Sequence, residues 1–249
     1  FLEKTNSMPK PMINVGNIPI LEHIMDIYSV QGHTEFIIAC GYKQEIIKRY
    51  FHDKLILGSD LHIEFNKEKN LSVIENKYKD WKISLIDTGN STQTGSRLLK
   101  LKPFLDNKFF LTYGDGLGNI NLQNLVDQHN KTNAEITITT INPKSRYGSV
   151  VVKGNKVKKF IEKPEFSSEI VNAGFMFVNK SFLKYIDPNQ NNIVLEAEPF
   201  QRAVKDGAMG AFHHRGFWHS MDNLRDNVEL NKIWNEGDLP WLKIQHVIS

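Results

Sequence analysis

Cysteine, long apolar runs and blocks of like charge are scarce in this sequence, and each shortage excludes a class of protein. The single cysteine, Cys40, rules out an internal disulfide and indicates a reducing compartment. No apolar run is long enough to cross a bilayer and no signal-peptide pattern is recognisable, so we expect a cytoplasmic protein without a membrane partner. The net charge is only +3 and no basic block stands out, which disfavours nucleic acid as a partner.

Several familiar catalytic patterns are also missing. The chain has no G-x-x-x-x-G-K-[ST] loop, and no Ser-His-Asp or Cys-His set in a recognisable context. His213 and His214 form no zinc pattern with a cysteine or a spaced histidine. The remaining composition, 40% hydrophobic and 24% charged over 249 residues, is ordinary for a globular protein that buries a substantial core.

Alternating helical and strand patterns predict an α/β fold. Pro19 opens a helical pattern, Glu35–Cys40 is typical of a buried strand, and a second helix is expected from Gln44 to Phe51. This order of elements favours a parallel sheet. The later part of the chain changes character, because its predicted strands are short and separated by turns, as in an antiparallel or mixed addition.

The stretch Phe109–Asn121 is the part around which we expect the chain to be organised. It starts with the apolar run Phe109–Tyr113, which suits a strand buried on both faces, and then breaks into a turn at Gly114-Asp115-Gly116. Ligands of open α/β sheets bind at the carboxyl ends of strands, so Asp115 is placed to hold a divalent metal against phosphate oxygens. The alternative is that Asp115 serves the start of a helix.

A second carboxylate, Asp222, follows a short aromatic strand expected near Gly216–Trp218. Together with Asp115 it would hold one Mg²⁺, which takes few protein carboxylates and fills its octahedron with water and substrate phosphates. The alternative is that Asp222 caps the helix expected from Leu224.

Basic residues occur in two settings that suit a phosphate. Lys10 lies between two prolines, which holds a cation rigidly, although general surface use is the alternative. Arg97 follows Thr94-Gly95-Ser96 near a helix start, where free backbone N–H groups would hold a base or a phosphate. The alternative there is a capping loop with Thr94 or Ser96 as the cap.

Two further segments suit a sugar phosphate. Glu162 and Lys163 stand side by side before a proline and combine acceptors for hydroxyls with a cation for a phosphate. Asn172-Ala173-Gly174 places small residues before a strand and lets a ligand approach the backbone, although a simple β-bulge is the alternative.

Taken in order, these segments resemble the sugar-nucleotidyltransferase family over almost the whole chain. The segments that carry the resemblance are PKPMINVGNIPILEHIM, IIACGYKQEIIKRYF, DWKISLIDTG, TQTGSRLLK, FLTYGDG, RYGSVVV, FIEKP, NAGFMFV, EAEPFQ and FWHSMDNLRD. The resemblance implies a Rossmann-like α/β fold, with a nucleotide-binding core over 1–141 and a sugar-phosphate-binding part over 142–249. The implied reaction is CTP plus glucose 1-phosphate giving CDP-glucose and pyrophosphate, with Mg²⁺, in a homo-oligomer.

The resemblance also implies roles for individual residues. The implied metal ligands are Asp115 and Asp222. The implied phosphate-binding cations are Lys10 for the nucleotide and Lys163 for the sugar. The implied sugar pocket consists of Tyr147, Gly148, Glu162, Asn172 and Gly174. The implied nucleotide side consists of Thr94, Gly95, Arg97 and Gly114. By analogy with oligomeric relatives, the polar excursion over residues 52–80 is the expected subunit contact.

The sequence departs from the family pattern in three places. The family begins with a strand and a loop of the form L-A-G-G-x-G-T-R-L, which this sequence lacks. A missing central strand would leave unpaired backbone on both neighbours, so we expect that residues precede the sequence in the natural protein, or that another segment or subunit fills the gap. Met8 stands where a lysine is usual and Ser96 where a glycine is usual. Alternatives are a relative that uses another nucleotide or sugar, and a non-catalytic nucleotide-sugar-binding homologue.

Overall fold

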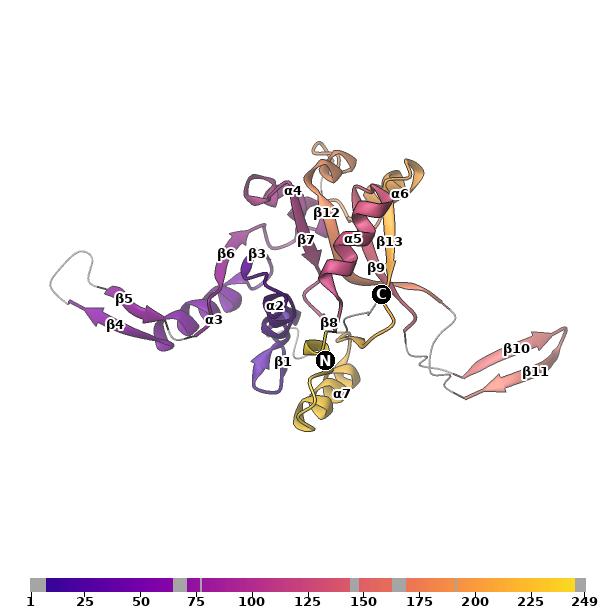
Figure 1. Ribbon diagram of the computed structural model, residues 1–249, viewed down its shortest axis with the longest axis horizontal. Helices are drawn as coiled ribbons and strands as arrows, with labels where there is room; N and C mark the ends of the chain where they lie inside the picture. Colours follow the sequence, from indigo (N-terminus) through magenta and orange to yellow (C-terminus); the bar gives the residue numbers. More distant parts are fainter. Residues whose placement is uncertain are drawn as a thin grey trace. The chain divides into compact units, whose positions relative to one another are not determined.

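The computed structural model describes residues 8–64, 71–76, 78–143, 148–162, 169–190 and 192–244 (Figure 1). Two predicted site residues, Tyr147 and Lys163, lie outside these ranges. The chain divides into two compact units, unit 1 with Phe1–Leu105 and Leu183–Gln201, and unit 2 with Asp106–Phe182 and Arg202–Ser249. The assignment of nucleotide and sugar binding to parts of the chain stays a prediction.

Unit 1 is built on a parallel strand pair packed against helices. Strand β3 (Glu35–Cys40) pairs with β6 (Lys82–Asp87), and the register sets Cys40 opposite Asp87. Helices α2 (Ile20–Ser29) and α3 (Gln44–Leu57) supply apolar side chains to the core. The buried members of this core are Met12, Leu21, Met25, Cys40, Ile47 and Phe51. The predicted α/β alternation is therefore confirmed, with α3 running past Phe51 to Leu57.

The other elements of unit 1 are short. They are η1 (Lys10–Met12), β1 (Asn14–Val15), β2 (Ile18–Pro19), β4 (Ser59–Ile63), β5 (Leu71–Asn76), α4 (Thr94–Leu101) and η2 (Lys102–Phe104). Both β1–β2 and β4–β5 are antiparallel pairs. The prolines around Lys10 do not prevent regular structure, because η1 is a 3₁₀ turn in which proline occupies a first-turn position that needs no N–H donor.

Unit 2 contains a four-stranded mixed sheet in the order β13-β9-β12-β7. Its strands are β7 (Lys108–Thr112), β9 (Ile136–Ile141), β12 (Val171–Asn179) and β13 (Met209–His213). Strand β12 runs antiparallel to both β7 and β9, whereas β13 runs parallel to β9. Helix α5 (Leu122–Thr132) lies along one face of this sheet and buries Leu122, Leu125 and His129 (Figure 1). The result is a mixed α/β fold, as predicted.

The remaining elements of unit 2 surround that sheet. They are β8 (Gly116–Gly118), β10 (Ser149–Lys153), β11 (Lys156–Ile161), β14 (Trp218–Ser220), α7 (Leu224–Asn235) and η4 (Pro240–Leu242). Two elements, η3 (Lys180–Tyr185) and α6 (Glu198–Lys205), span the divisions between the units. Within the described ranges, no helix has the length and apolar character to cross a bilayer.

Two strands are less buried than the sequence predicts. We expected Phe109–Tyr113 to be buried on both faces, but β7 is the last strand of its sheet and its apolar side chains are half-buried. Strand β3 is half-buried over most of its length as well, and within the described residues it pairs only with β6. The apolar composition of both strands is correct, but composition cannot tell an edge strand from a central one.

Candidate active site

The short strand pair β8–β14 brings the two predicted aspartates together. The antiparallel register sets Ser220 opposite Gly116. Immediately beyond that pair, the Met221 backbone N–H donates to the Asp115 carbonyl at 2.8 Å. Asp222 therefore follows a residue that is hydrogen-bonded to Asp115, although 107 positions (222 − 115) separate the two aspartates in the sequence. Asp115 is half-buried and Asp222 is exposed, so a ligand can reach this pair.

Neither aspartate starts a helix, which removes the alternative that the sequence left open for each. The residue after Asp115 enters strand β8, and helix α5 is capped by Asn121, whose side chain accepts from the Asn124 backbone N–H at 2.9 Å. Helix α7 is capped by Asn223, which forms a capping box with Asp226. Neither the Asp115 nor the Asp222 carboxylate is therefore used as a helix cap.

The backbone on either side of Asp222 is held in place. The Asp226 carboxylate accepts from the Asp222 N–H at 2.9 Å and from the Asn223 N–H at 3.2 Å. The Ser220 hydroxyl donates to Asp222 Oδ2 at 2.7 Å. His219 directly precedes Ser220, and its Nε2 lies 3.4 Å from the Glu229 carboxylate. These contacts orient Asp222 before any ligand binds.

A shift in the pairing register of β12 places two predicted sugar-pocket residues, Asn172 and Gly174, beside Tyr113, which precedes the Asp115 turn. The β12–β9 register shifts between Asn172 and Met176, so the bulge that the sequence left as an alternative is present. Gly174 has φ +81° there, and an added Cβ would lie 2.6 Å from the Tyr113 ring. The Tyr113 N–H donates to the Gly174 carbonyl at 3.1 Å, and the Asn172 amide lies 3.4 Å from the Tyr113 hydroxyl.

The indole of Trp218 ties this bulge to the strand that leads to Asp222. Its Nε1–H donates to the Ala173 carbonyl at 2.8 Å, across from β14 to β12. Asp115, Asp222, Asn172 and Gly174 are consequently connected through Tyr113 and Trp218. The sequence did not identify Tyr113 and Trp218 as site residues, because their contribution is hydrogen bonds to residues far along the chain, which only the tertiary structure creates.

The two carboxylates of Asp115 and Asp222 suit a hard cation only if water and substrate oxygens supply its remaining ligands. Among the described residues, no group of three or more His, Cys, Asp or Glu side chains is arranged to hold a metal. Two carboxylates without soft ligands fit Mg²⁺, which keeps several waters and accepts phosphate oxygens.

Two other predicted sugar-pocket residues meet at the base of the β10–β11 ribbon. A Cβ added to Gly148 would lie 3.3 Å from Glu162 Oε2 and 2.8 Å from the Phe160 ring. Only glycine fits at this position without moving that ring.

On the predicted nucleotide side, the expectation of free N–H groups at the start of α4 is wrong. The Gly95 and Ser96 N–H groups both donate to the Ile193 carbonyl, at 2.9 and 3.2 Å, and the Gln93 N–H donates to the Asn192 side chain. Neither Thr94 nor Ser96 caps the helix, since the N-cap is Gln93 and makes no side-chain cap bond.

The hydroxyls near the start of α4 also face the 192–196 segment. Thr94 accepts from the Leu195 N–H at 2.9 Å and donates to Glu196 at 2.8 Å, and Ser96 accepts from the Ile193 N–H at 2.8 Å. The helix start is used for packing because Gly95 lets the Ile193 backbone approach within van der Waals contact.

Arg97 lies at the carboxyl ends of the parallel pair β3–β6. Its Nε donates to the Thr92 carbonyl and its Nη1 to the Thr88 hydroxyl, both at 2.8 Å. Thr88 in turn donates its backbone N–H to the Cys40 carbonyl at 2.8 Å. Gly41 packs directly against the guanidinium, where a side chain would collide with it. This is the edge at which parallel α/β sheets bind ligands.

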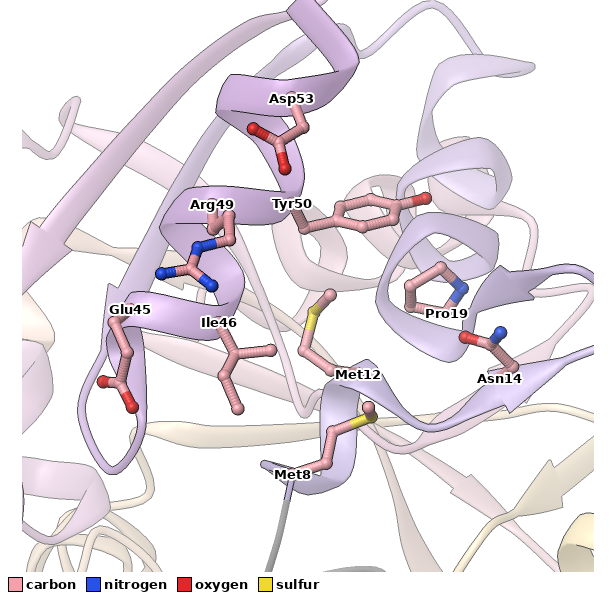
Figure 2. A pocket seen from close by; sticks show the side chains of 9 residues that line it. All are labelled: Met8, Met12, Asn14, Pro19, Glu45, Ile46, Arg49, Tyr50 and Asp53. Atoms are coloured by element: carbon pink, nitrogen blue, oxygen red, sulfur yellow. The ribbon is translucent and has the colours of Figure 1, made fainter.

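Lys10 begins the 3₁₀ turn η1 and is half-buried. A hollow of about 540 Å³ lies close to it, between the 8–19 segment and helix α3. Figure 2 shows Glu45, Arg49 and Asp53 one after another along α3, with Met8 and Met12 across from them. None of the predicted site residues lines this hollow. Met8, at the position where the family pattern has a lysine, gives it an apolar wall.

Comparison with known proteins identifies the class of protein. The profile described as nucleotidyl transferase matches residues 4–235. Because the match covers nearly the whole chain, the chain belongs to the nucleotidyl transferase family and is an enzyme of that kind. This family generally uses a divalent metal.

Particular relatives narrow the class. The chain is 37% identical to the glucose-1-phosphate cytidylyltransferase of Salmonella typhimurium, over 96% of this chain and 93% of that protein. It is 38% identical to the probable glucose-1-phosphate cytidylyltransferase of Bacillus subtilis, with the same two coverages. The resemblance inferred from the sequence is confirmed by these relatives.

Solved structures show the same fold at lower identity. HddC from Yersinia pseudotuberculosis superposes with a TM-score of 0.65 at 19% identity, covering 91% of this chain and 90% of that one. A UDP-glucose pyrophosphorylase complexed with UDP-glucose also gives a TM-score of 0.65, at 14% identity and with 95% and 94% coverage. The Rossmann-like α/β fold is thereby confirmed.

Proposed function

We propose that this enzyme transfers a cytidylyl group from CTP to α-D-glucose 1-phosphate and releases pyrophosphate, giving CDP-glucose. The supporting observation is the juxtaposition of Asp115 and Asp222 by the β8–β14 pair, with neither carboxylate used as a helix cap. The similarity to cytidylyltransferases along nearly the whole chain supports the choice of CTP and glucose 1-phosphate.

We further propose that Asp115 and Asp222 together hold one Mg²⁺. The fit rests on their donor chemistry, since two oxygen ligands leave room for water and phosphate oxygens. When bound, Mg²⁺ offsets the repulsion between the two anionic substrates and stabilises charge on the phosphates. Asp226 and Ser220 keep Asp222 oriented, and the backbone bond between Asp115 and Met221 holds the backbones of the two aspartates close together.

The proposed reaction needs no covalent enzyme intermediate. The sugar-phosphate oxygen attacks the α-phosphorus, and the chain contributes positioning and positive charge. Lys10 binds the nucleotide phosphates and Lys163 the sugar phosphate. Arg97 adds a cation on the nucleotide side.

The remaining predicted residues bind without reacting. Tyr147, Gly148, Glu162, Asn172 and Gly174 line the sugar pocket in this proposal. Thr94, Gly95 and Gly114 contact the nucleotide. Because the N–H groups of Gly95 and Ser96 donate to the Ile193 carbonyl, any nucleotide contact from the start of α4 must involve groups other than those two amides. We also propose a cytoplasmic homo-oligomer without nucleic-acid or membrane partners.

The direct test measures pyrophosphate release by the protein with glucose 1-phosphate and CTP, dTTP or UTP in turn, with and without Mg²⁺. Turnover with CTP that greatly exceeds turnover with the other nucleotides, and that stops when Mg²⁺ is chelated, supports the proposal. Preference for another nucleotide would identify a relative with different specificity. Binding of CTP and glucose 1-phosphate without turnover would identify a non-catalytic homologue.

A further inference from the structure

The register shift in β12 leaves one buried residue outside both strand ladders. Strand β12 pairs with β9 through Val171–Asn172 and Met176–Val178, and with β7 through Phe175–Asn179. Within the described sheet, neither register includes Ala173, which is only 3% exposed. A buried carbonyl without a hydrogen-bond donor is costly, so the donor that Ala173 finds elsewhere decides whether the bulge keeps its position.

The Trp218 indole is that donor. Its Nε1–H donates to the Ala173 carbonyl at 2.8 Å, from β14 to β12. The ring lies against two glycines of β8, since a Cβ added to Gly116 would lie 3.6 Å from Nε1 and one added to Gly118 would lie 3.2 Å from Cδ1. The second distance is shorter than ordinary van der Waals contact, so glycine at position 118 gives the indole the room to reach Ala173.

Two other hydrogen bonds shape the bulge itself. The Asn172 side-chain oxygen accepts from the Gly174 N–H at 2.9 Å, and the Gly174 carbonyl accepts from the Tyr113 N–H at 3.1 Å. Both involve Gly174, and neither reaches β14. Of these three bonds, only the one from Trp218 connects the bulge to the strand that leads to Asp222.

Trp218 therefore belongs to both parts of the proposed site. Its backbone lies opposite Gly118 in the β8–β14 pair, which brings the backbones of the two aspartates together. We propose that Trp218 is a positioning residue for the sugar phosphate, because its indole N–H holds the β12 bulge in place relative to those aspartates. The proposal rests on the proposed function, which assigns sugar binding to Asn172 and Gly174.

Loss of the indole N–H should weaken binding of the sugar and spare the nucleotide. CDP-glucose and CDP share the cytidine and both phosphates, and only CDP-glucose carries a hexose, so their dissociation constants separate the two effects. Without its donor, the Ala173 carbonyl turns toward water and moves Asn172 and Gly174 with it. We expect the dissociation constant of CDP-glucose to rise about tenfold, as for the loss of one well-placed hydrogen bond, and that of CDP to change less than about twofold.

Calorimetric titration of two variants and one control measures these constants. Trp218→Phe removes the N–H and shortens the ring. Incorporation of 3-benzothienylalanine at position 218 replaces the N–H by sulfur and keeps the two-ring shape, so it isolates the hydrogen bond if phenylalanine disturbs packing. Trp81→Phe is the matched control, because the Trp81 indole also donates a hydrogen bond, at 3.0 Å to the Ser29 hydroxyl, and neither residue has a proposed substrate contact. Both dissociation constants should stay unchanged in this control.

A double-mutant cycle tests whether the indole acts through the bulge. Asn172→Ala removes one proposed sugar contact, so in that background Trp218→Phe should weaken CDP-glucose binding by less than about threefold. A purely stabilising role would instead lower the unfolding temperature of Trp218→Phe while the ratio of the two dissociation constants stayed at its wild-type value. The KM for glucose 1-phosphate should rise together with the dissociation constant of CDP-glucose, whereas the KM for CTP should not.

Three results would overturn the inference. If both changes at position 218 leave CDP-glucose binding at the wild-type level, Trp218 has no positioning role and the proposed reaction still stands. If CDP and CDP-glucose binding weaken equally, the indole acts on the fold or on the nucleotide side rather than on the sugar pocket. If the wild-type protein releases no pyrophosphate and binds CDP-glucose no more tightly than CDP, the proposed function is rejected, and the role of Trp218 with it.

Discussion

At the scale of single residues, the proposed chemistry depends on two aspartates whose backbones the β8–β14 pair brings together. Asp115→Asn or Asp222→Asn should lower kcat by about 100-fold or more, because each change removes a charged ligand of the proposed metal. The fold should persist, since Asp222 is exposed, Asp115 is only half-buried, and an amide has nearly the same shape as a carboxylate. Steady-state kinetics and thermal unfolding measure the two effects.

A second readout separates metal binding from other roles of these aspartates. Mg²⁺ should raise the unfolding midpoint of the wild-type protein but not that of either variant. Asp206→Asn, at an exposed position of unit 2, serves as the control and should behave like wild type. Normal kcat in either aspartate variant would remove that residue from the proposed site.

Two constraints favour glycine at position 174, namely a left-handed backbone and the Tyr113 ring, which leaves no room for a Cβ. Its φ is +81° and an added Cβ would collide with Tyr113, whereas Gly207 has φ +64° with nothing within 4 Å of its added Cβ. Gly207→Ala should therefore cost about 1–2 kcal/mol of unfolding free energy from the backbone alone. Gly174→Ala should cost about 1–3 kcal/mol more, because the methyl group displaces the Tyr113 ring.

Urea unfolding of both glycine variants measures this difference. Because Tyr113 lies two positions before Asp115, Gly174→Ala should also reduce turnover, which Gly207→Ala should not. Equal stability losses in the two variants would contradict the proposed contact.

At the scale of elements, a buried carboxylate joins helices α2 and α3 to the segment after β5. Glu22 on α2 is 1% exposed and accepts hydrogen bonds from the hydroxyls of Tyr50 and Tyr78. The Lys79 ammonium lies 3.1 Å from Glu22 and 2.6 Å from Asp26. Burial alone would raise the pKa of Glu22, but the hydrogen bonds from Tyr50, Tyr78 and Lys79 together lower it below its ordinary value of 4.5.

Glu22→Gln should lower the free energy of unfolding by about 2 kcal/mol or more, because the charged hydrogen bonds of a buried group are lost. A carboxyl with a lowered pKa stabilises the fold above its ordinary pKa, and this contribution is lost as pH falls below about 4.5. Denaturant titrations at pH 7 and pH 4 test both points, and the variant should show the smaller loss between them. Glu45→Gln, at an α3 position nearer the surface, is the control.

At the scale of the whole molecule, both units bury neutral histidines. His23 in unit 1 and His129 and His214 in unit 2 are 1%, 1% and 8% exposed. Burial lowers the pKa of each of the three imidazoles below its ordinary value of 6.5. The unfolded chain therefore binds protons that the folded chain does not as pH falls below about 6.5, so stability declines in that direction.

Urea unfolding between pH 8 and pH 5 should show this decline starting near pH 6.5. His129→Gln, which keeps a polar side chain next to Thr137 and Asn179, should reduce the steepness of the decline. Stability that rises between pH 7 and pH 5.5 would show that these imidazoles are not held neutral.

Much of this organisation could be predicted because its signals are local. Strand β3 has the predicted bounds of Glu35 and Cys40, and helix α7 begins at the predicted Leu224, since hydrophobic period and turn residues act over a few neighbours. Strand β8 was missed because a Gly-Leu-Gly tripeptide has no strand signal of its own. It becomes a strand only through its pairing with β14.

The sequence by itself determined the residue types of the proposed chemistry, the α/β fold and the family, because order and spacing of segments are properties of the chain. Only the tertiary structure decided that Asn121 and Asn223, rather than the two aspartates, cap helices α5 and α7. It also decided that Ile193 occupies the N–H groups at the start of α4. The two caps are local bonds, but Asp and Asn are about equally good caps, so residue type could not show which residue is used. Backbone pairing between residues about 100 positions apart leaves no local pattern in a sequence.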